Sequence, residues 1–530
     1  MQDRAYWHSE IYFFSLLFAF TSIFWGKMFI SISTAILLIH FIIEGNIWIR
    51  IKKVFAHKGS YYFLCLFFLQ FVAFIFTDNY KEAIRQIPSS LPALVFPLAI
   101  FSRDSLPIRR ITILLKFFVL SLFINSLYCT LRFSFWLPSD IDARELSRFM
   151  SHIRYSIYIN IAILVLFYFI IKLRSLSTKF EFVFAIILLL WFCSFLYAMH
   201  SLTGLALFFV NLLLCTYLFL KNNANRGFRL LFIFILSLTL LSSSYFIIVE
   251  LNFFLFPDKI NTEKIDEVTA KGNRYNTFVV PSSIENGHYV YLYICQEEAQ
   301  KAWNEKSKMP FEGLDKKQQP LQSTLYRYLT SKNLRKDYQG IYQLTNEDIA
   351  NIEAGMTNYR FQSRFAFNMR IYELCWEINE YKNGVLHNYH SVTQRLRFIS
   401  CALEVINNNL LFGTGLGDLN DDMKAIYGSG KYQLPENLWR LPHNQYLTHI
   451  AAYGIIGFTL ILICFFISIK NGIKQNRFLV IAWSIFLVLS MMVEDTLESY
   501  DGLVLFCLFG ALFIKMSFFP KLENSITNNQ

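Results

Sequence analysis

The chain has 530 residues, of which 55% are hydrophobic, 18% aromatic and only 16% charged. A soluble domain carries roughly 25% charged residues, so this composition excludes a soluble globular protein and predicts an all-α polytopic membrane protein. The formal net charge of +11 does not indicate a nucleic-acid binder, because the basic residues gather in short segments between apolar runs, where they orient a membrane protein.

Apolar segments follow one another along most of the chain. A helix that crosses a hydrocarbon core of ~30 Å needs about 20 mostly apolar residues. About twelve segments qualify: 11–26, 28–44, 61–77, 88–102, 111–130, 155–172, 180–199, 202–220, 229–249, 446–469, 478–493 and 502–518. The first lacks a small-residue cleavage site, so we expect a retained helix and not a signal peptide. Pro92 and Pro97 interrupt the fourth, which membrane helices tolerate when neighbours satisfy the freed backbone groups.

The short loops predict how these helices are oriented. One face is rich in lysine and arginine, in the loops at 50–58, 103–110, 172–179, 221–229 and 470–477. By the positive-inside rule this face is cytoplasmic, which places both termini in the cytoplasm and residues 252–444 outside. The external loop 131–154 is an exception, because it holds Arg132, Arg144, Arg148 and Arg154. It is either an anion site or one of the external loops that tolerate basic residues.

Three parts are therefore predicted: helices one to nine (1–251), a large external loop (252–444) and the last three helices (445–530). A loop of this length is expected to be functional, since structureless loops beyond about 12–15 residues are uncommon. Its first half, to about Pro320, is expected to be irregular. Helical patterns follow it: one begins at Ser323, one follows a capping sequence at 345–348, and two run over 361–381 and 392–407.

The run Leu441–Leu447 brings His443 and Asn444 to the predicted start of the tenth membrane helix. A neutral imidazole titrates near pH 6.5 and can take a proton from a hydroxyl group at working pH. His443 is therefore a candidate general base. The alternative is a histidine that caps the membrane helix together with Asn444, an interpretation that the nearby His449 would favour.

Arg395 and Arg397 stand at the start of an amphipathic helix in the same loop. A guanidinium group suits phosphate oxygens and stays charged, so both are candidates for binding an anionic leaving group. The alternative is a solvated helix face. Glu494 lies with Asp495 and Glu498 at the external end of the eleventh helix, where acids are costly unless they are paired. It either pairs with Arg395 or a neighbouring basic residue, or it faces water.

The run Gly413–Asp418 looks like a dinucleotide fingerprint, but it lacks the preceding strand and the βαβ context. We expect Gly413 and Gly415 to form a tight turn that lets backbone approach the site. Hard cations need more oxygen ligands than the acidic residues after this turn clearly offer. No metal-like spacing links the three cysteines of the external loop. The sequence therefore predicts neither a metal nor a cofactor.

With these features in place, the chain resembles the O-antigen ligase and polymerase family. The similarity covers most of the chain in topology and is most specific over 393–458. There the family shows an arginine opening a helix, an Ala-Leu pair, a Gly-x-Gly turn and His-Asn before a membrane helix. These motifs stand here as Arg395, Ala402-Leu403, Gly413-Thr-Gly415 and His443-Asn444, followed by Tyr446-Leu447 and by Gly454 and Gly457.

The resemblance implies a metal- and ATP-independent glycosyltransferase of the bacterial inner membrane, with its large loop in the periplasm. A ligase of this family moves a finished glycan from undecaprenyl diphosphate to a sugar of lipid A–core. The resemblance assigns Arg395 to the donor diphosphate and His443 to activation of the acceptor hydroxyl. Leu202 stands where family members often carry a second arginine. Either the alignment is shifted there, or Arg154 or Arg397 replaces that arginine, and we favour Arg154.

Three other functions stay open. A polymerase of the same family joins repeat units on the lipid carrier, and an O-linked protein oligosaccharyltransferase would use a protein acceptor. The single large loop late in the chain favours the ligase. A lipid-linked oligosaccharide flippase would place polar groups near the bilayer midplane, often with internal repeats. The corresponding stretches here are nearly uncharged, with Lys116 as an exception.

Overall fold

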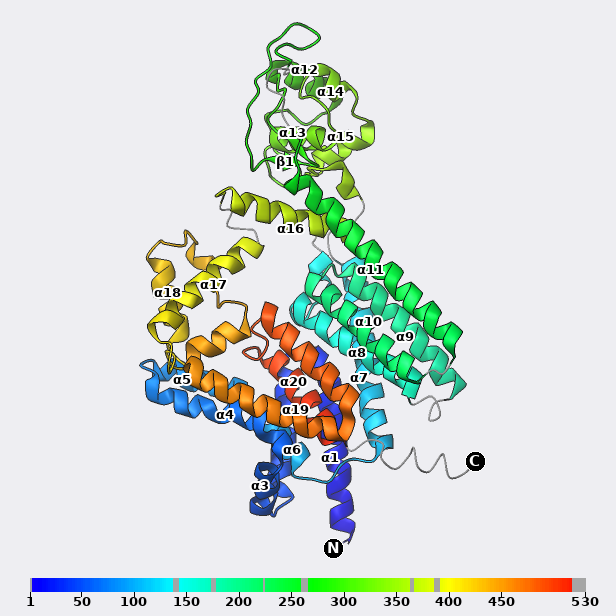
Figure 1. Ribbon diagram of the computed structural model, residues 1–530, viewed down its shortest axis with the longest axis vertical. Coiled ribbons are helices and arrows are strands. Elements are labelled where there is room, and N and C mark those ends of the chain that lie inside the picture. Colours follow the sequence, from blue (N-terminus) through cyan, green and yellow to red (C-terminus); the bar gives the residue numbers. More distant parts are fainter. Residues whose placement is uncertain are drawn as a thin grey trace. The chain divides into compact units, whose positions relative to one another are not determined.

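Regular structure in this protein is almost wholly helical (Figure 1). The computed structural model describes residues 2–136, 143–172, 178–222, 225–258, 266–362, 367–385 and 391–516. The chain divides into two units. Unit 1 comprises Met1–Phe232 and Arg395–Gln530, and unit 2 comprises Ile233–Gln394. The long loop predicted at 252–444 is therefore split, because its last fifty or so residues pack with the membrane helices of unit 1 and not with unit 2.

Unit 1 holds most of the long apolar helices. Its helices are α1 (Gln2–Ser22), α2 (Lys27–Ile43), α3 (Ile47–Ala56), α4 (Tyr61–Ala73), α5 (Tyr80–Ser90), α6 (Pro92–Phe101), α7 (Ile108–Phe135), α8 (His152–Lys172), α9 (Lys179–Ala198), α10 (Leu202–Asn222), α17 (Ser391–Asn408, which begins in unit 2), α18 (Leu419–Gly428), α19 (Gln445–Val493) and α20 (Tyr500–Lys515). Helix α11 (Arg226–Leu255) belongs partly to each unit.

Within the described part of the chain, eight helices are long and apolar enough to cross a membrane. A ninth is added if α2 and α3, bent by 116° at their junction, form one broken span. Every one of the twelve predicted segments falls on a helix, but the number of spans is smaller than predicted. One reason is length, since α20 and the arm Phe478–Val493 have 16 residues each. Sixteen residues extend only about 24 Å, less than the ~30 Å of a hydrocarbon core.

Helix α19 doubles back on itself. A straight helix of its 49 residues would extend about 73 Å, but residues at its two ends are hydrogen-bonded. Asn444 Nδ2 donates to the carbonyl oxygen of Met492 at 3.3 Å, and the Tyr446 hydroxyl donates to that of Val488 at 2.9 Å. The two arms correspond to the segments predicted at 446–469 and 478–493, so the start and the end of α19 meet.

Close packing joins the helices of unit 1. A Cβ added at Gly204 of α10 would lie 2.5 Å from the Ser156 Cβ of α8, so the two backbones touch as small residues allow in membrane bundles. Asn160 Nδ2 donates across the same contact to the Gly204 carbonyl oxygen at 3.0 Å. On the other side of the bundle α20 runs beside α19 (Figure 1), and Trp483 Nε1 donates to the Phe506 carbonyl oxygen at 3.1 Å.

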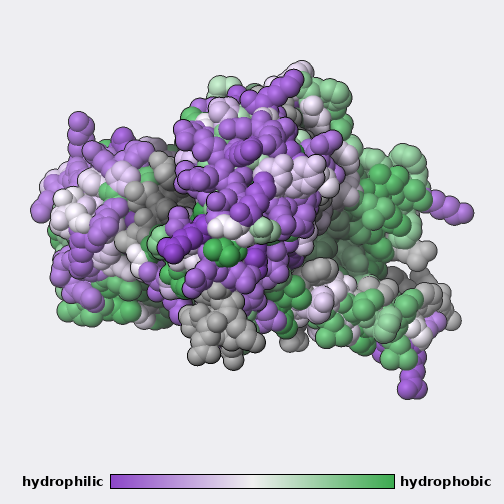
Figure 2. Space-filling model, turned by 90° about the horizontal axis from the view of Figure 1, so that it is seen from above, coloured by the Kyte–Doolittle hydropathy of each residue, from purple (hydrophilic) through white to green (hydrophobic). Residues whose placement is uncertain are grey.

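Unit 2 contains short helices and one small hairpin, and hydrophilic side chains cover much of its surface (Figure 2). Its elements besides α11 are β1 (Ile284–Glu285), β2 (His288–Tyr289), α12 (Gln296–Lys306), α13 (Leu321–Ser331), α14 (Tyr338–Tyr342), α15 (Asn346–Glu353) and α16 (Phe367–Lys382). The predicted cap of α15 is confirmed, because Thr345 and Asp348 form a capping box. The prediction of an irregular first half is wrong at α12, where Ala299, Ala302 and Trp303 bury one helix face.

Candidate functional site

His443 and Asn444 begin α19, and their roles differ. Asn444 is the N-cap, because its Oδ1 accepts hydrogen bonds from the backbone nitrogens of Tyr446 and Leu447 at 3.1 and 3.2 Å. His443, one residue earlier, has a φ of 50°, in the left-handed region that L-residues rarely adopt. The capping expected of the His-Asn pair is thus done by Asn444, which leaves the imidazole of His443 outside the cap.

Asp495 holds His443 in this conformation. Its Oδ2 accepts from the backbone nitrogen of His443 at 2.9 Å, and its Oδ1 accepts from the Thr448 hydroxyl at 2.6 Å. Gln445 makes a second connection to the same turn. Its Nε2 donates to Glu498 Oε1 at 3.0 Å, and its Oε1 accepts from the Leu497 backbone nitrogen at 2.7 Å. The turn that follows α19 is therefore fastened to the residues that begin it.

Glu494 faces the imidazole of His443. The Nδ1 atom of His443 lies 3.7 Å from Glu494 Oε2, an ion-pair distance slightly longer than a hydrogen bond. Nδ1 is buried, although the His443 side chain as a whole is 31% exposed, so the exposure lies on the other ring atoms. The Phe398 ring packs beside the imidazole, with ring centroids 5.9 Å apart. The ring is therefore held with one nitrogen toward a carboxylate.

Two arginines act on the same carboxylate. Burial of Glu494 acts to raise its pKa, but contact with His443 and the positive charges of His443, Arg154 and Arg395 outweigh burial and leave the pKa below its ordinary value. A charge has this effect only over a short range. The charges of Arg154 in α8 and Arg395 in α17 therefore act on the same carboxylate as His443, which precedes α19.

The two arginines differ in their bonding. Arg154, near the start of α8, pairs with Asp501 through Nη1, and its Nε donates to the Ser151 hydroxyl at 3.0 Å. Arg395 is half-buried, and its guanidinium forms no hydrogen bond or ion pair with the residues that the structure describes. A half-buried cation that has no such partner among the described residues is suited to an anionic ligand.

Arg397 has a different environment from Arg395. Its side chain is only 4% exposed, and its Nη1 lies 3.4 Å from the carbonyl oxygens of both Tyr432 and Gln433. Gln433 has a positive φ of 48°, so the guanidinium supports an unusual turn. We therefore do not keep Arg397 among the diphosphate ligands.

The turn at Gly413 and Gly415 packs against α19. The backbone nitrogens of Thr414 and Gly415 donate to the carbonyl oxygens of Ala451 and Ala452 at 2.9 and 3.1 Å. Both Gly413 and Gly415 have positive φ values, 76° and 89°. A Cβ at Gly415 would lie 2.3 Å from Thr77 Oγ1, and one at Gly413 would lie 2.5 Å from the Ala452 backbone. Only glycine fits at either position.

Gly415→Ala should destabilise unit 1 by about 2–5 kcal/mol, because it adds a steric clash to the cost of a left-handed alanine. Gly430→Ala is the matched control, since Gly430 has a φ of 78° with nothing within 4 Å of its added Cβ. It should cost only about 1–2 kcal/mol. Thermal unfolding of the purified protein measures both. Equal losses in the two variants would contradict the close approach to Thr77.

The acidic residues after the turn have structural partners. Asp418 accepts from the backbone nitrogens of Asp78 and Asn79 at 2.7 Å each, and Asp421 accepts from Asn79 Nδ2 at 2.7 Å. These bonds fix the start of α5. Among the residues that the structure describes, no group of three or more His, Cys, Asp or Glu side chains could hold a metal ion.

The segment that carries most of this geometry also matches a known family. Residues 352–462 match the family model described as O-Antigen ligase. The match confirms the resemblance found in the sequence, and it includes Arg395, the glycine turn and His443. It supports a membrane glycosyltransferase of the O-antigen ligase or polymerase type. A search of curated proteins found no match.

Three residues that complete the site were not singled out from the sequence: Thr448, Gln445 and Asp501. Thr448 and Gln445 are hydrogen-bonded to residues about fifty positions away along the chain. Asp501 pairs with Arg154 of a distant helix. A pattern within one helix does not reveal such partners. The only available signal was the concentration of acids after the eleventh apolar segment, which marked Glu494 and Asp495 together.

Proposed function

We propose that this protein is an O-antigen ligase-like glycosyltransferase. It moves a glycan from undecaprenyl diphosphate to a sugar of lipid A–core, or a similar acceptor, at the periplasmic face of the bacterial inner membrane. The observation that carries the proposal is the arrangement around Glu494: an imidazole nitrogen lies 3.7 Å from the carboxylate, and the charges of two guanidinium groups help to lower its pKa. This arrangement combines a general base with cations for a leaving diphosphate.

His443 acts as the base in this proposal. With the Nδ1 proton directed to Glu494, the lone pair is on Nε2, on the exposed side of the ring. Nε2 takes the proton of the acceptor hydroxyl as its oxygen forms a bond to the anomeric carbon. The bond from that carbon to the diphosphate oxygen breaks in the same step, so the configuration inverts. The proton remains on His443 until it is lost to water.

The arginines stabilise the charge that develops on the departing diphosphate. Arg395 provides two adjacent N–H donors that match two phosphate oxygens, and it forms no ion pair with a carboxylate in the part of the chain that the structure describes. Arg154 adds a second positive charge, partly compensated by Asp501. Preorganised donors of this kind cost no reorganisation during the reaction. Apolar side chains exposed on the helices, such as Ile75, Leu190 and Ile463, suit contact with the lipid tail and the bilayer.

The deciding experiment uses purified protein, a lipid-diphosphate-linked glycan and a lipid A–core acceptor, with no ATP and with a chelator present. Transfer of the glycan to the acceptor supports the ligase. Lengthening of the lipid-linked glycan in place of transfer would identify a polymerase. Movement of the donor across vesicle membranes without any transfer would contradict the enzymatic proposal and favour a flippase.

Arg154→Ala should weaken binding of the lipid-diphosphate donor by roughly 10- to 100-fold, the value of one charge-assisted hydrogen bond. Leu202→Arg is the comparison variant, because it restores an arginine at the position where the family often has one. It should change donor affinity far less. Equilibrium binding of the labelled donor measures both variants, and an unaltered affinity in Arg154→Ala would remove Arg154 from the donor site.

A further inference from the structure

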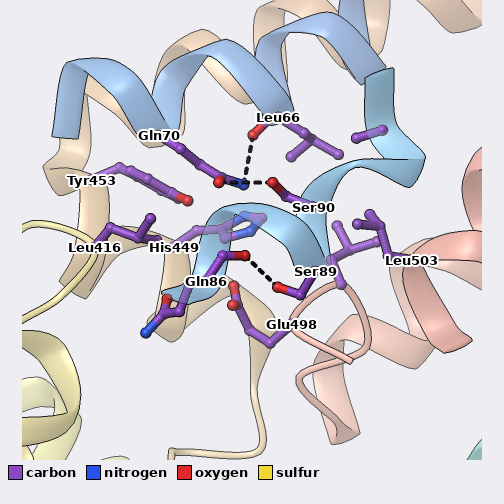
Figure 3. A pocket seen from close by; sticks show the side chains of 12 residues that line it. Leu66, Gln70, Gln86, Ser89, Ser90, Leu416, His449, Tyr453, Glu498 and Leu503 are labelled. Atoms are coloured by element: carbon purple, nitrogen blue, oxygen red, sulfur yellow. Dashed lines mark hydrogen bonds between the residues drawn. The ribbon is translucent and has the colours of Figure 1, made fainter. Parts of the chain in front are cut away.

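A polar cavity lies beside the turn that carries Glu494. It is lined by α4, α5, α19 and the residues that lead into α20. Polar side chains from α4, α5, α19 and the turn after α19 lie around it (Figure 3). The polar residues that line the cavity include Gln70, Gln86, Ser89, His449 and Glu498. The cavity belongs wholly to unit 1, and the proposed reaction does not use any of these five groups.

The size of the cavity limits what it can hold. Its volume is about 30 Å³, and a cavity needs roughly 10–15 Å³ to hold one water molecule. Two or so water molecules fit, or an equal number of hydroxyl groups. A complete sugar ring does not fit, but the edge of a ring, with a hydroxyl or hydroxymethyl group, does.

His449 supplies an unsatisfied polar atom in this cavity. Its side chain is 2% exposed, and its Nδ1 has no hydrogen-bond partner among the residues that the structure describes. Buried polar atoms are almost always hydrogen-bonded, because an unpaired one costs roughly 1–3 kcal/mol of desolvation. In Figure 3 the imidazole lies among the polar side chains of the cavity. A molecule that occupies the cavity can supply the missing partner.

Glu498 adds a group that can both donate and accept. Its Oε1 already accepts from Gln445 Nε2, and the rest of the carboxyl is open to the cavity. Burial away from water raises the pKa of Glu498 to about 7, and the negative charge of Asp495 contributes in the same direction. At neutral pH the carboxyl is present in both protonation states, so it matches a hydroxyl group in either hydrogen-bonding role.

The chemistry of the lining favours an uncharged ligand. Carboxamide, hydroxyl, imidazole and carboxyl groups line the cavity, and no lysine or arginine is among the lining residues. A phosphate group would meet a carboxyl and no cation, so this is not the diphosphate site. Sugar hydroxyls both donate and accept, which suits a lining that contains both donors and acceptors.

We propose that this cavity is a subsite that binds the hydroxyl groups at one edge of a substrate sugar, next to the reacting centre. The inference rests on the proposed glycosyl transfer. Glu498 follows Glu494 in the short turn between α19 and α20, and a hydrogen bond from Gln445 connects Glu498 to the start of α19. The subsite therefore selects which sugar lies against His443, because a site built to bond a hydroxyl group discriminates strongly against an analogue that lacks it.

The test uses two variants of the full-length purified protein. Ser89→Leu fills the cavity, and Glu498→Gln keeps its shape but removes the carboxyl. Thr459→Leu is the control, since Thr459 is exposed on α19 and its hydroxyl bonds only to the Ile455 carbonyl oxygen. Binding of the lipid-linked donor glycan and of the acceptor glycan is measured separately by titration. The KM for each glycan and kcat are measured in the transfer assay.

Ser89→Leu should weaken binding of one of the two glycans about 10- to 100-fold and raise its KM similarly, while kcat at saturation changes less than threefold. The other glycan and the control should be unaffected. Glu498→Gln should weaken the same glycan about tenfold, the value of one hydrogen bond. Unchanged affinity for both glycans in both variants would show that the cavity holds only water and would overturn the proposal.

The binding arm separates this inference from the proposed function. If His443→Ala stops transfer and binds both glycans normally, the proposed function holds and the subsite is judged by Ser89→Leu alone. If the wild-type protein binds a glycan through the cavity but never transfers it, the subsite holds and the proposed function fails.

Discussion

His443→Ala should reduce glycan transfer by about 10²- to 10⁴-fold, the usual contribution of a general base, while the protein stays folded. The loss is expected in kcat, because the imidazole acts on the acceptor proton in the transition state and binds neither the lipid nor the diphosphate. Transfer in the purified system gives the rate, and thermal unfolding checks the fold. Near-normal transfer would remove His443 from the catalytic role.

His443→Asn is the matched variant, because alanine alone confuses two effects. His443 has a φ of 50°, and asparagine tolerates this left-handed conformation better than alanine does. If the imidazole is the base, both variants are equally inactive. If alanine fails only because the start of α19 is distorted, asparagine restores transfer, and that result would contradict the proposed chemistry.

The partner of the base can be tested in the same way. Glu494→Gln should slow transfer, because a carboxamide orients His443 but does not stabilise the imidazolium ion formed in the reaction. The double variant with His443→Ala should be no slower than His443→Ala alone, since residues that act as a unit are not additive. Additive losses would mean that Glu494 acts independently of His443.

Arg395→Lys should fail substantially, with a loss of roughly 10- to 100-fold in kcat/KM, and Arg395→Ala should lose more. A lysine keeps the charge but loses the pair of fixed donors that match two phosphate oxygens. Arg395 forms no ion pair with a carboxylate among the described residues, and Glu494, on which its charge acts, keeps His443 and the charge of Arg154. Steady-state transfer with varied donor concentration measures the effect.

Arg85→Lys provides the control for this substitution. The Arg85 side chain is 79% exposed and pairs with Glu82 one turn away, where such pairs contribute little. It should transfer glycan at the wild-type rate. Full activity of Arg395→Lys would show that charge alone is enough, and the bidentate geometry proposed for the diphosphate would then be wrong.

Several features of the site could be read from local sequence patterns. The run that places His443 before an apolar segment predicted the start of α19, and Arg395 was predicted on a helix that the structure confirms as α17. Helix patterns are local, because hydrophobic periodicity and capping depend on residues three or four positions apart. For the same reason the cap at Thr345 and the break at the glycine turn were predicted from a few residues each.

Contacts between distant parts of the chain could not be read in that way. Arg395 and Arg397 are two residues apart and look equivalent in the sequence. Arg395 has no hydrogen-bond partner among the described residues, whereas Arg397 supports the turn at Tyr432 and Gln433. Gly413 and Gly415 were predicted to form a tight turn, and only the structure shows that this turn packs against α19 and Thr77. The reversal of α19 decides these differences, since it brings the turn after Val493 back to His443.

The sequence by itself therefore determined the class of the protein and its apolar helices, because composition and short-range periodicity report burial in lipid and helix formation. His443 and Arg395 became the candidate base and leading arginine through their side-chain chemistry and the resemblance to the O-antigen ligase family. Only the tertiary structure decided which side chains meet: Glu494 with His443 and both arginines, Asp495 with the His443 backbone, and His449 with Glu498 around one cavity. These contacts depend on how helices pack, and packing is set by side-chain shapes over the whole bundle and not by any single segment.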